Sequence, residues 1–564
     1  MAPSAKPVLL LAHPGNDALA TRVTKIRWKV LCDATIFSSV EIQNTNQNLE
    51  LKGRLSVQDL SDFVFHRDRF GTVRVSENLQ AKVRSSYQAL QNLISKGVPI
   101  YGVTTGFGDS SNRYVKKNHA EQLQKNLIDY LSCGQGRWIP PEAARAMFLI
   151  RLNSLAQGIS AVSPELIERM CLLLEKDILP VVPSEGSLGA SGDLVPLAYL
   201  GQTIQGFGDV YHQGSVQPAA PIFAQHKIFP YALKAKEGLA IVNGTSTMAG
   251  MVLYNLKLVD QVVELCELAT AWQCLLLGGR TEAFGPFINE VAKTNPGQST
   301  SAKSIRGVLE AESYNPARGQ DVSVDQNKTS EFIQDPYSLR CVPQILGPIR
   351  ENLKNSWSIL EHEINSVTDN PVVDSAGQLE MGGNFYGGYL CQAMDFVKIN
   401  LAHIADLVDR QVLMIVSEKF SRGLSPNLID TKNIPEDEQH MHHGMKGVHQ
   451  TVGALTSEII QKSIPSGIFS RSSESHNQDK VSLGMSASMS CLEMIEGVYK
   501  ILAMQLVCLT QAMDLRGAKL QGERSQTIYQ LVRMHVAFMS GDRSLGAEIH
   551  HLTQALKEAA FRKS

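Results

Sequence analysis

The chain has 564 residues, of which 43% are hydrophobic, and its 53 basic and 55 acidic residues give a formal net charge of −2. This balance gives no electrostatic basis for binding nucleic acid or an anionic membrane, so a small-molecule partner is favoured. Nine scattered cysteines without a Cys-x-x-Cys pair predict reduced thiols in the cytoplasm, and the apolar run Val8 to Ala12 is too short for the core of a signal peptide.

The predicted elements are mainly helical. Apolar residues recur at helical spacing in eight segments, namely 78–97, 118–132, 142–178, 246–278, 345–367, 386–417, 446–464 and 481–515. Charged residues interrupt the longer apolar stretches, so no membrane span is expected. Short strands are expected in the turn-rich segment 202–230, notably at Val210 to His212. The polar stretch 279–335 is expected to hold one helix near Ala302 to Ala311.

Ala190-Ser191-Gly192 is a tripeptide able to form an electrophile from its own backbone. If a tight turn brings the amide nitrogen of Gly192 onto the carbonyl of Ala190, a five-membered ring closes, and loss of water leaves an exposed methylene. Ala190 and Gly192 are small enough for that approach, and Ser191 supplies the β-hydroxyl that is eliminated. Asp193 and Pro196 predict a helix start directly after the turn. The ordinary alternative is a glycine-rich turn without chemistry.

Three segments with glycine precede long apolar helical patterns. They are Gly192-Asp193, Asn243-Gly244-Thr245 and Gly383-Asn384-Phe385. Because helix N-termini favour negative charge, three starts that converge would stabilise electron density in the ring. Taken singly, each is better interpreted as an ordinary loop connection.

The seventeen residues from Ser184 to Leu200 resemble the aromatic amino acid ammonia-lyase and aminomutase family, which includes histidase and the phenylalanine and tyrosine ammonia-lyases. Further resembling segments follow in chain order at 101–108, 237–245, 334–341, 365–371, 382–385 and 476–479. The resemblance is closest in type to phenylalanine ammonia-lyase. It runs from about Leu49 to the C-terminal region and leaves residues 1–48 without a match.

The resemblance implies a fold, a cofactor and an assembly. The fold is mainly α, with a long central helical bundle of the fumarase/histidase-like type and a smaller mixed N-terminal part. The cofactor is 4-methylidene-imidazol-5-one (MIO), formed autocatalytically from Ala190, Ser191 and Gly192, without a metal. The assembly is a homotetramer with shared active sites. The expected divisions are an unassigned extension (1–48), an N-terminal domain with the ring (49–240), the helical bundle (241–530) and a C-terminal helical segment (531–564).

The same resemblance implies roles in elimination of ammonia. The ring activates the amino group, and Tyr101, on a loop flanked by glycines, removes the β-proton. Tyrosine normally titrates near pH 10, so Tyr101 requires a lowered pKa or the field of a helix end. Arg340 matches the arginine that binds the substrate carboxylate through a bidentate fork, and Tyr337 shares its face of the chain. Without the resemblance, Tyr101 is an anchoring aromatic and Arg340 a surface ion-pair partner.

Further matching residues surround the substrate. Asn243 and Gln334 match residues near the ring, Leu194, Asn384 and Phe385 match its wall, and Lys446 matches a lysine near the carboxylate. Glu474 and Gln478 match the pair near the amine, and their spacing of four places them on one face if that segment is a helix. The histidines at 440, 442, 443 and 449 have no carboxylate or cysteine companion at the spacing of a zinc site, so no metal is expected.

Substrate preference is expected to depend on Tyr130-Leu131. In the family, Phe-Leu accompanies phenylalanine, His-Leu accompanies tyrosine and Ser-His accompanies histidine. Leu131 disfavours histidine because an apolar wall offers an imidazole no hydrogen bond, and Gln478 stands where histidases carry a glutamate. Tyr130 keeps aromatic bulk but adds a hydroxyl. The sequence therefore predicts conversion of L-phenylalanine to trans-cinnamate, with tyrosine ammonia-lyase or 2,3-aminomutase activity as alternatives.

Overall fold

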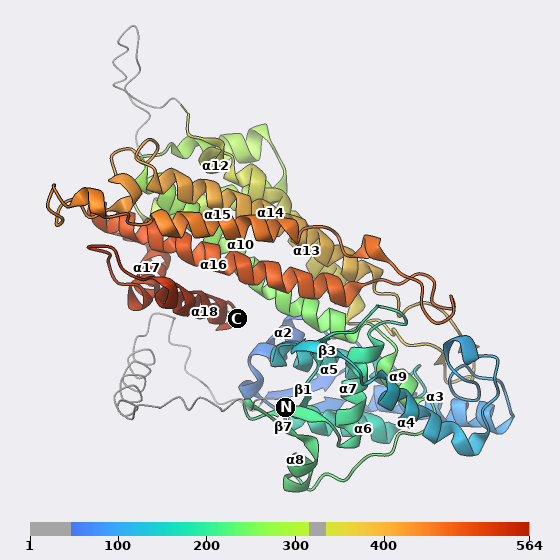
Figure 1. The fold of residues 1–564 in the computed structure, drawn as a ribbon. Coiled ribbons are helices and arrows are strands. Elements are labelled where there is room, and N and C mark those ends of the chain that lie inside the picture. Colours follow the sequence, from blue (N-terminus) through green and yellow to red (C-terminus); the bar gives the residue numbers. More distant parts are fainter. Residues whose placement is uncertain (1–46, 315–333, 563–564) are drawn as a thin grey trace, which may run out of the picture. The chain divides into compact units, whose positions relative to one another are not determined.

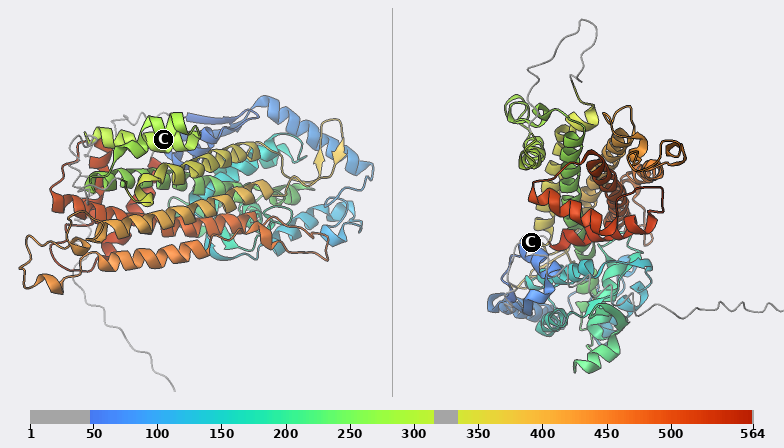
Figure 2. Two further views of the ribbon diagram at one scale, coloured as in Figure 1. Left: turned by 90° about the horizontal axis from the view of Figure 1, so that it is seen from above. Right: turned by 90° about the vertical axis from the view of Figure 1, so that its left-hand side faces the viewer.

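The predicted mainly helical fold is confirmed in the computed structural model, which describes residues 47–314 and 334–562 (Figure 1). The long helices of the central bundle are α10 (Ser246–Leu276), α13 (Val342–Glu363), α14 (Gly388–Val416), α15 (Lys446–Gln461) and α16 (Gly484–Arg516). They run side by side in the views of Figure 2, with α10, α14 and α16 in mutual contact. Among the described residues, no helix is both long and apolar enough to cross a membrane.

Helix α10 forms the centre of the bundle because its 31 residues are apolar on nearly every side. Two of its buried polar side chains have partners on neighbouring helices of the bundle. Glu267 accepts hydrogen bonds from Arg350 Nε and Nη2 at 2.8 and 2.6 Å, and Gln273 donates to the carbonyl of Gln411 at 2.9 Å. The apolar surface of α10 is therefore buried within one chain.

Helix α14 differs from α10 because it leaves one stripe uncovered. Its exposed positions follow an alternating spacing of three and four residues: Tyr389, Gln392, Phe396, Ile399, His403, Asp406, Arg410 and Leu413. This spacing is typical of a helix face that packs against another helix. Tyr389 is 73% and Phe396 54% exposed, so large apolar side chains on this stripe have no covering element in the described chain.

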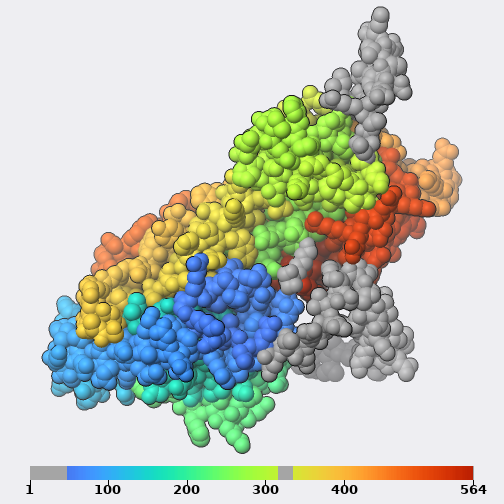
Figure 3. Space-filling view, turned by 180° about the vertical axis from the view of Figure 1, so that it is seen from behind, coloured from blue at the N-terminus to red at the C-terminus, as the bar shows by residue number. Residues whose placement is uncertain are grey.

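Four helices cover the sides and one end of the bundle. They are α11 (Pro296–Ala311), α12 (Tyr337–Arg340), α17 (Glu523–His535) and α18 (Gly546–Arg562). Helix α11 packs against α13, as the light green and yellow surfaces show in Figure 3. Helix α12 is a single turn directly before α13, and α18 packs against α16.

The N-terminal part is mixed, as expected. Its helices are α2 (Val57–Phe65), α3 (Glu77–Ser95), α4 (Ala120–Leu131), α5 (Pro141–Ala156), α6 (Pro164–Glu175), α7 (Leu194–Gln205), α8 (Ala219–Gln225) and α9 (Glu237–Val242). Strands β1 (Gln47–Leu51) and β2 (Phe70–Val75) pair in parallel. In an antiparallel sheet, β3 (Gln135–Trp138) pairs with β5 (Pro183–Glu185). A second antiparallel sheet has the order β4 (Leu179–Pro180), β6 (Asp209–His212), β7 (Ser215–Pro218). Outside this part, between α13 and α14 in the chain, β8 (Val372–Val373) pairs with β9 (Leu379–Glu380).

Helix α5 joins the N-terminal part to the bundle. A Cβ at Gly250 of α10 would lie 2.7 Å from the carbonyl oxygen of Ala143, so α5 and α10 approach each other as closely as their backbones allow. The hydrophobic core is continuous from Leu49 to Ala560. The expected domain divisions stay predictions.

Two helix predictions were wrong in extent. The pattern at 142–178 forms two helices, α5 and α6, because Gly158 (φ 78°) and Ala161 (φ 56°) are left-handed and Pro164 starts a new helix. The helix expected at 302–311 begins at Pro296, since Asn295 and Pro296 already supply a start. The strand at Val210 to His212 is confirmed within β6. The extension up to residue 46 and the segment 315–333 lie outside the described residues.

Candidate active site

Residues 189–192 form the tight turn that ring closure requires. Gly189 and Gly192 pair with each other, and Ala190 and Ser191 lie between them. Ser191 (φ 57°) and Gly192 (φ 80°) are both left-handed. A Cβ at Gly192 would lie 2.2 Å from the carbonyl oxygen of Gly244, so only glycine fits at that position.

Four helices begin around this turn. The three predicted starts correspond to α7, α10 and α14, and α16 adds a fourth. Met248, in the first turn of α10, lies so close to Gly387 and Gly484 that its sulfur would be 2.1 and 2.5 Å from a Cβ at either position. Gly387 precedes α14 and Gly484 begins α16, so the positive ends of these helices converge near Ser191.

Asp193 connects two of these starts. It occupies the N-cap position of α7, as predicted, but its carboxylate does not cap that helix. It accepts from the backbone nitrogen of Met248 at 2.8 Å and from Ser187 Oγ at 3.2 Å, so it caps α10 instead. Complete burial raises the pKa of Asp193 to about 7, against the opposing effect of these hydrogen bonds.

Two amide side chains contact Ser191. Asn243 Nδ2 donates to the carbonyl oxygen of Ser191 at 2.9 Å, and Gln478 Nε2 donates to Ser191 Oγ at 3.2 Å. Asn243 is 3% exposed and directly follows α9, so its position is fixed by the backbone around it. These donors hold both oxygens of Ser191.

The turn faces a cavity of about 340 Å³. Nine of the residues expected at the site line it, and Gly192 completes the turn beside them. The nine are Tyr101, Tyr130, Ala190, Ser191, Leu194, Asn243, Phe385, Glu474 and Gln478.

Tyr101 points its hydroxyl back to its own loop, where the oxygen accepts a hydrogen bond from the nitrogen of Gly108 at 3.0 Å. Burial raises the pKa of Tyr101, and the charge of Glu474 adds to the rise, while the bond from Gly108 lowers it. Of the two conditions expected from the sequence, a lowered pKa or the field of a helix end, this direction is opposite to the first. The physical reason is chiefly that the phenol is buried, and the charge of Glu474 adds to the rise.

Glu474 lies on a loop and not on the expected helix. Glu474, Ser475 and His476 are all left-handed, and Ser473 pairs with Gln478 to close the loop. A Cβ at Gly108 would be 1.6 Å from Glu474 Oε2, so the carboxylate lies directly against the Tyr101 loop. Both Glu474 and Gln478 still face the cavity, because the closed loop presents them together.

Tyr130 forms part of the cavity wall and is 55% exposed. Partial burial raises its pKa to about 12, and Glu474 and Tyr101 contribute. Leu131 is placed differently from expectation, since it is buried in the core and Leu127, one turn earlier on α4, lines the cavity. Asn384 is also outside the cavity, where it is exposed and donates to the carbonyl of Val367 at 3.4 Å.

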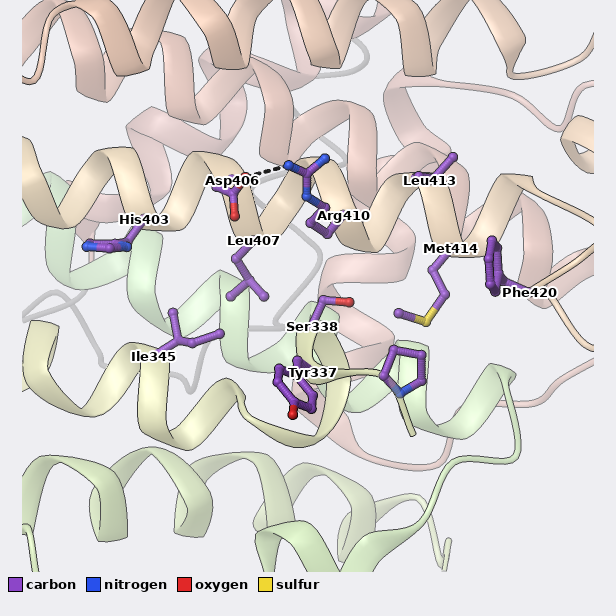
Figure 4. Close-up of a pocket in the computed structure, with 11 residues that line it drawn as sticks. Tyr337, Ser338, Ile345, His403, Asp406, Leu407, Arg410, Leu413, Met414 and Phe420 are labelled. Carbon is purple, nitrogen blue, oxygen red and sulfur yellow. Dashed lines mark ion pairs between the residues drawn. The ribbon is translucent and has the colours of Figure 1, made fainter. Parts of the chain in front are cut away.

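The remaining expected residues lie at the other end of the bundle. Tyr337 is 70% exposed and lines a second cavity of about 430 Å³ with residues of α14 (Figure 4). The guanidinium carbon of Arg340 lies 4.6 Å from the centre of the Tyr337 ring, so these two residues share a face, as expected. Gln334 is exposed three residues before Tyr337, and Lys446 is the exposed first residue of α15.

The length of helix α13 gives the distance between the end of the bundle at Arg340 and the end at Ser191. It begins at Val342, two residues after Arg340, and its last residue, Glu363, accepts a hydrogen bond from Thr245 Oγ1 beside the turn at 2.5 Å. Its 22 residues span about 33 Å at 1.5 Å per residue. Arg340 and Tyr337 therefore cannot reach Ser191 of their own chain.

The cavity also contains residues that the sequence reasoning did not single out. They include Asn370, Tyr386, Asn477, Asp479 and Lys480. Asn370, Asn477 and Asp479 fall inside segments that resemble the family, so that resemblance was an available signal. Nothing in the pattern marked Lys480, which is the one lysine or arginine among the described residues that line the cavity.

Comparison with known proteins places this geometry in a family. The model of the aromatic amino acid lyase family matches residues 55–534. A histidine ammonia-lyase from Natranaerobius thermophilus is 31% identical over 518 residues, covering 92% of this chain and 97% of the relative. A tyrosine ammonia-lyase from Cupriavidus metallidurans is 34% identical over 498 residues, covering 86% and 92%. The crystal structure of a tyrosine aminomutase from Streptomyces globisporus has a TM-score of 0.84 at 30% identity, covering 92% and 98%.

The fold and the relatives define a carbon–nitrogen lyase. The chain belongs to the aromatic amino acid lyase family.

Proposed function

We propose that this enzyme eliminates ammonia from L-phenylalanine to give trans-cinnamate, with MIO formed from Ala190, Ser191 and Gly192. The observation that carries the proposal is the left-handed turn at these residues, which faces a cavity that also contains Tyr101. The turn fits the group for three reasons. Gly192 has no room for a side chain, Ser191 presents its hydroxyl to Gln478, and the carbonyl of Ser191 is held by Asn243.

The chain's own residues perform the remaining chemistry. When formed, MIO supplies an electrophilic methylene that activates the amino group as a leaving group. Tyr101, held by Gly108, receives the β-proton once its phenol is ionised. Glu474 adds negative charge beside the phenol and suits the cationic amine of the substrate. The converging helix starts stabilise negative charge at the turn. The electron pair of the broken C–H bond forms the double bond between the α- and β-carbons, and the C–N bond breaks with its pair on nitrogen. Release of the amine together with the proton from Tyr101 gives ammonium and restores the phenolate.

Phenylalanine is proposed as substrate because apolar side chains form much of the cavity wall. They are Phe107, Leu127, Leu194, Leu239 and Phe385. Such a wall suits a phenyl ring and leaves the nitrogens of an imidazole without partners, which disfavours histidine. Tyrosine is the second candidate because the hydroxyl of Tyr130 is available to a phenol, and a relative of this chain is a tyrosine ammonia-lyase.

A 2,3-aminomutase is a further candidate because the chain is similar to a tyrosine aminomutase over nearly its whole length. Such an enzyme differs from a lyase by retaining the unsaturated acid until ammonia returns to the β-carbon. The balance between the two depends on how long the Tyr101 loop stays closed.

We also propose a homotetramer whose active sites combine residues of different chains. Two observations support it. Arg340 and Tyr337 lie about 33 Å of helix away from Ser191, so their proposed contact with substrate requires another copy. The exposed stripe on α14 runs from Tyr389 near the turn to Arg410 and Leu413 beside Tyr337 (Figure 4). Its spacing suits packing against a helix of a second chain, and Gln334 and Lys446 would then approach that chain's cavity.

The test measures the intact mass of the protein and the product that it releases. The intact mass of folded protein should be lower than the sequence mass by two waters, and incubation with L-phenylalanine should release trans-cinnamate, read by ultraviolet absorbance. L-Tyrosine and L-histidine serve as competing substrates, and chromatography detects a β-amino acid. An unmodified mass would contradict the MIO proposal. Turnover of L-tyrosine or L-histidine ahead of L-phenylalanine would contradict the substrate, and a β-amino acid as main product would favour the aminomutase.

A further inference from the structure

Arg151 is a charged side chain without a part in the mechanism described above. It lies near the middle of α5 and is 0% exposed. Burial lowers its pKa to about 10, while Asp369 and Asp193 oppose that change. The guanidinium is therefore charged at neutral pH, and a buried charge is stable only where its donors are satisfied.

The donors of Arg151 are directed to the end of α9. Nε donates to the carbonyl oxygen of Ala240 at 2.9 Å, and Nη2 donates to that of Asn243 at 2.7 Å. Nη1 donates to Thr368 Oγ1 at 3.2 Å. Ala240 lies in the last turn of α9 and Asn243 follows it, so the cation caps a helix C-terminus.

The residues that Arg151 holds are those that contact the turn. Asn243 donates its side-chain amide to the carbonyl of Ser191. Gly244 accepts from the nitrogen of Asp193 at 2.8 Å and pairs with Gly192. The guanidinium lies directly against Gly244, since a Cβ there would be 2.2 Å from Arg151 Nη1. Arg151 thus does not contact the turn itself, but contacts Asn243 and Gly244, the two residues that do.

We propose that Arg151 is a positioning residue that holds Asn243 and Gly244 against the Ala190-Ser191-Gly192 turn. Ring closure requires the nitrogen of Gly192 to approach the carbonyl of Ala190, and Gly244 fixes Gly192 from the other side. The inference deepens the proposed function and rests on it. In this proposal, Arg151 supports ring formation and also holds Asn243 where its amide contacts Ser191.

The geometry favours arginine over lysine at this position. A planar guanidinium donates to three acceptors in fixed directions, whereas an ammonium is a point charge on a flexible stem. Arg151→Lys keeps the charge and most of the length but loses the fork that joins Ala240, Asn243 and Thr368. Its effect therefore reports on geometry more than on charge.

The test compares Arg151→Lys with Arg145→Lys. Arg145 lies on the same helix, but its guanidinium binds the carboxylate of Asp177 and the carbonyl of Val64, which do not contact the turn. Intact mass gives the fraction of folded molecules that have lost two waters, and kcat, KM and the melting temperature are measured on the same samples. For Arg151→Lys we expect that fraction to fall to about half or less, or kcat per dehydrated molecule to fall about tenfold at nearly constant KM. Arg145→Lys should match the wild type in both, even where its melting temperature falls equally.

Arg151→Lys with the dehydrated fraction and kcat of Arg145→Lys would overturn the inference. An unmodified wild-type mass would overturn the proposed function, and the inference with it. If Arg151→Lys does not fold, Thr368→Val removes one acceptor while leaving the guanidinium in place. It should lower the dehydrated fraction or kcat in the same direction, and wild-type values in that variant would overturn the inference.

Discussion

The end of the bundle that holds Ser191 and the end that holds Arg340 present different groups. At the first end, helix starts surround a cavity that contains Glu474 and the two phenols of Tyr101 and Tyr130. At the other end, Arg340 lies over the exposed Tyr337, beside a cavity open along α14. In the proposed mechanism, one end has the groups for proton removal and the other has the fork for a carboxylate. Because helix α13 separates them by about 33 Å, a single chain carries both halves of the expected site but does not join them.

The comparison explains the unexpected direction of the Tyr101 pKa. In one chain, burial raises this pKa and Glu474 adds to the rise, and no arginine is among the described residues that line the cavity. A cation from another copy would act in the opposite direction. Lys480 offers a rival within the same chain, because it is a lysine on the cavity wall. The pH profile described below reports whether positive charge acts on the phenol.

The largest effect is expected at Ser191. Ser191→Ala removes the hydroxyl that ring formation eliminates, so no molecule should lose two waters and turnover should fall by about 10³-fold or more. The fold should persist, since alanine keeps the small volume of the turn. The checks are intact mass, circular dichroism and cinnamate release. Retention of most of the activity would break the assignment of this end of the bundle to catalysis.

The second-largest loss of turnover is expected for Tyr101→Phe. The substitution removes the proton acceptor, so turnover should fall by about 10²- to 10⁴-fold. The ring should still form, so intact mass should show the same loss of two waters as in the wild type.

The pH profile sharpens this prediction. A general base works when deprotonated, so a raised pKa requires kcat/KM of the wild type to rise with pH from neutrality towards the ordinary value of 10.0. The residual activity of Tyr101→Phe should lack that rise. A flat or falling wild-type profile would contradict Tyr101 as the base. A plateau well below 10.0 would show that positive charge, from Lys480 or from a second copy, acts on the phenol.

The smallest effect is expected at Tyr130. Tyr130→Phe should retain or improve turnover of L-phenylalanine, and Tyr130→His should shift preference towards L-tyrosine by about 10-fold, because an imidazole can bind the para-hydroxyl. The measurement is the ratio of kcat/KM for the two substrates, with Tyr114→Phe as a matched control at an exposed tyrosine outside the cavity. An unchanged ratio in both Tyr130 variants would show that Tyr130 does not face the substrate.

The sequence supplied the helical bundle and much of the turn's surroundings, because these depend on local patterns. The glycines at 189 and 192, the apolar run of α10 and the start of α7 are each visible in a few consecutive residues. The break at Gly158 was missed because apolar spacing continues across it. The loop at Glu474 was missed because a spacing of four fits a helix as well as a closed loop. Leu131 could not be separated from Leu127 by pattern, since both lie on the same side of α4.

The spacing of apolar residues could not predict that the expected site residues lie at two ends of the bundle. Segments 101–108 and 334–341 each match the family, but their distance depends on the length and direction of α13 and α14. Arg151 was missed for a related reason. Its role depends on contacts with Ala240, Asn243 and Thr368, which are distant in the chain and meet only in the fold.

The central claim is that one active site uses Ser191 and Arg340 from different chains, and co-expression of two inactive variants tests it most directly. Ser191→Ala and Arg340→Ala are given different tags, expressed together, and purified through both tags in sequence. Arg340→Ala alone should raise KM and lower turnover, because the substrate carboxylate loses its fork. In mixed oligomers, random assembly gives about a quarter of the sites both intact residues, so activity should return to about that fraction of wild type. Mixed oligomers no more active than the two parents would show that each site is built within one chain and would contradict the account.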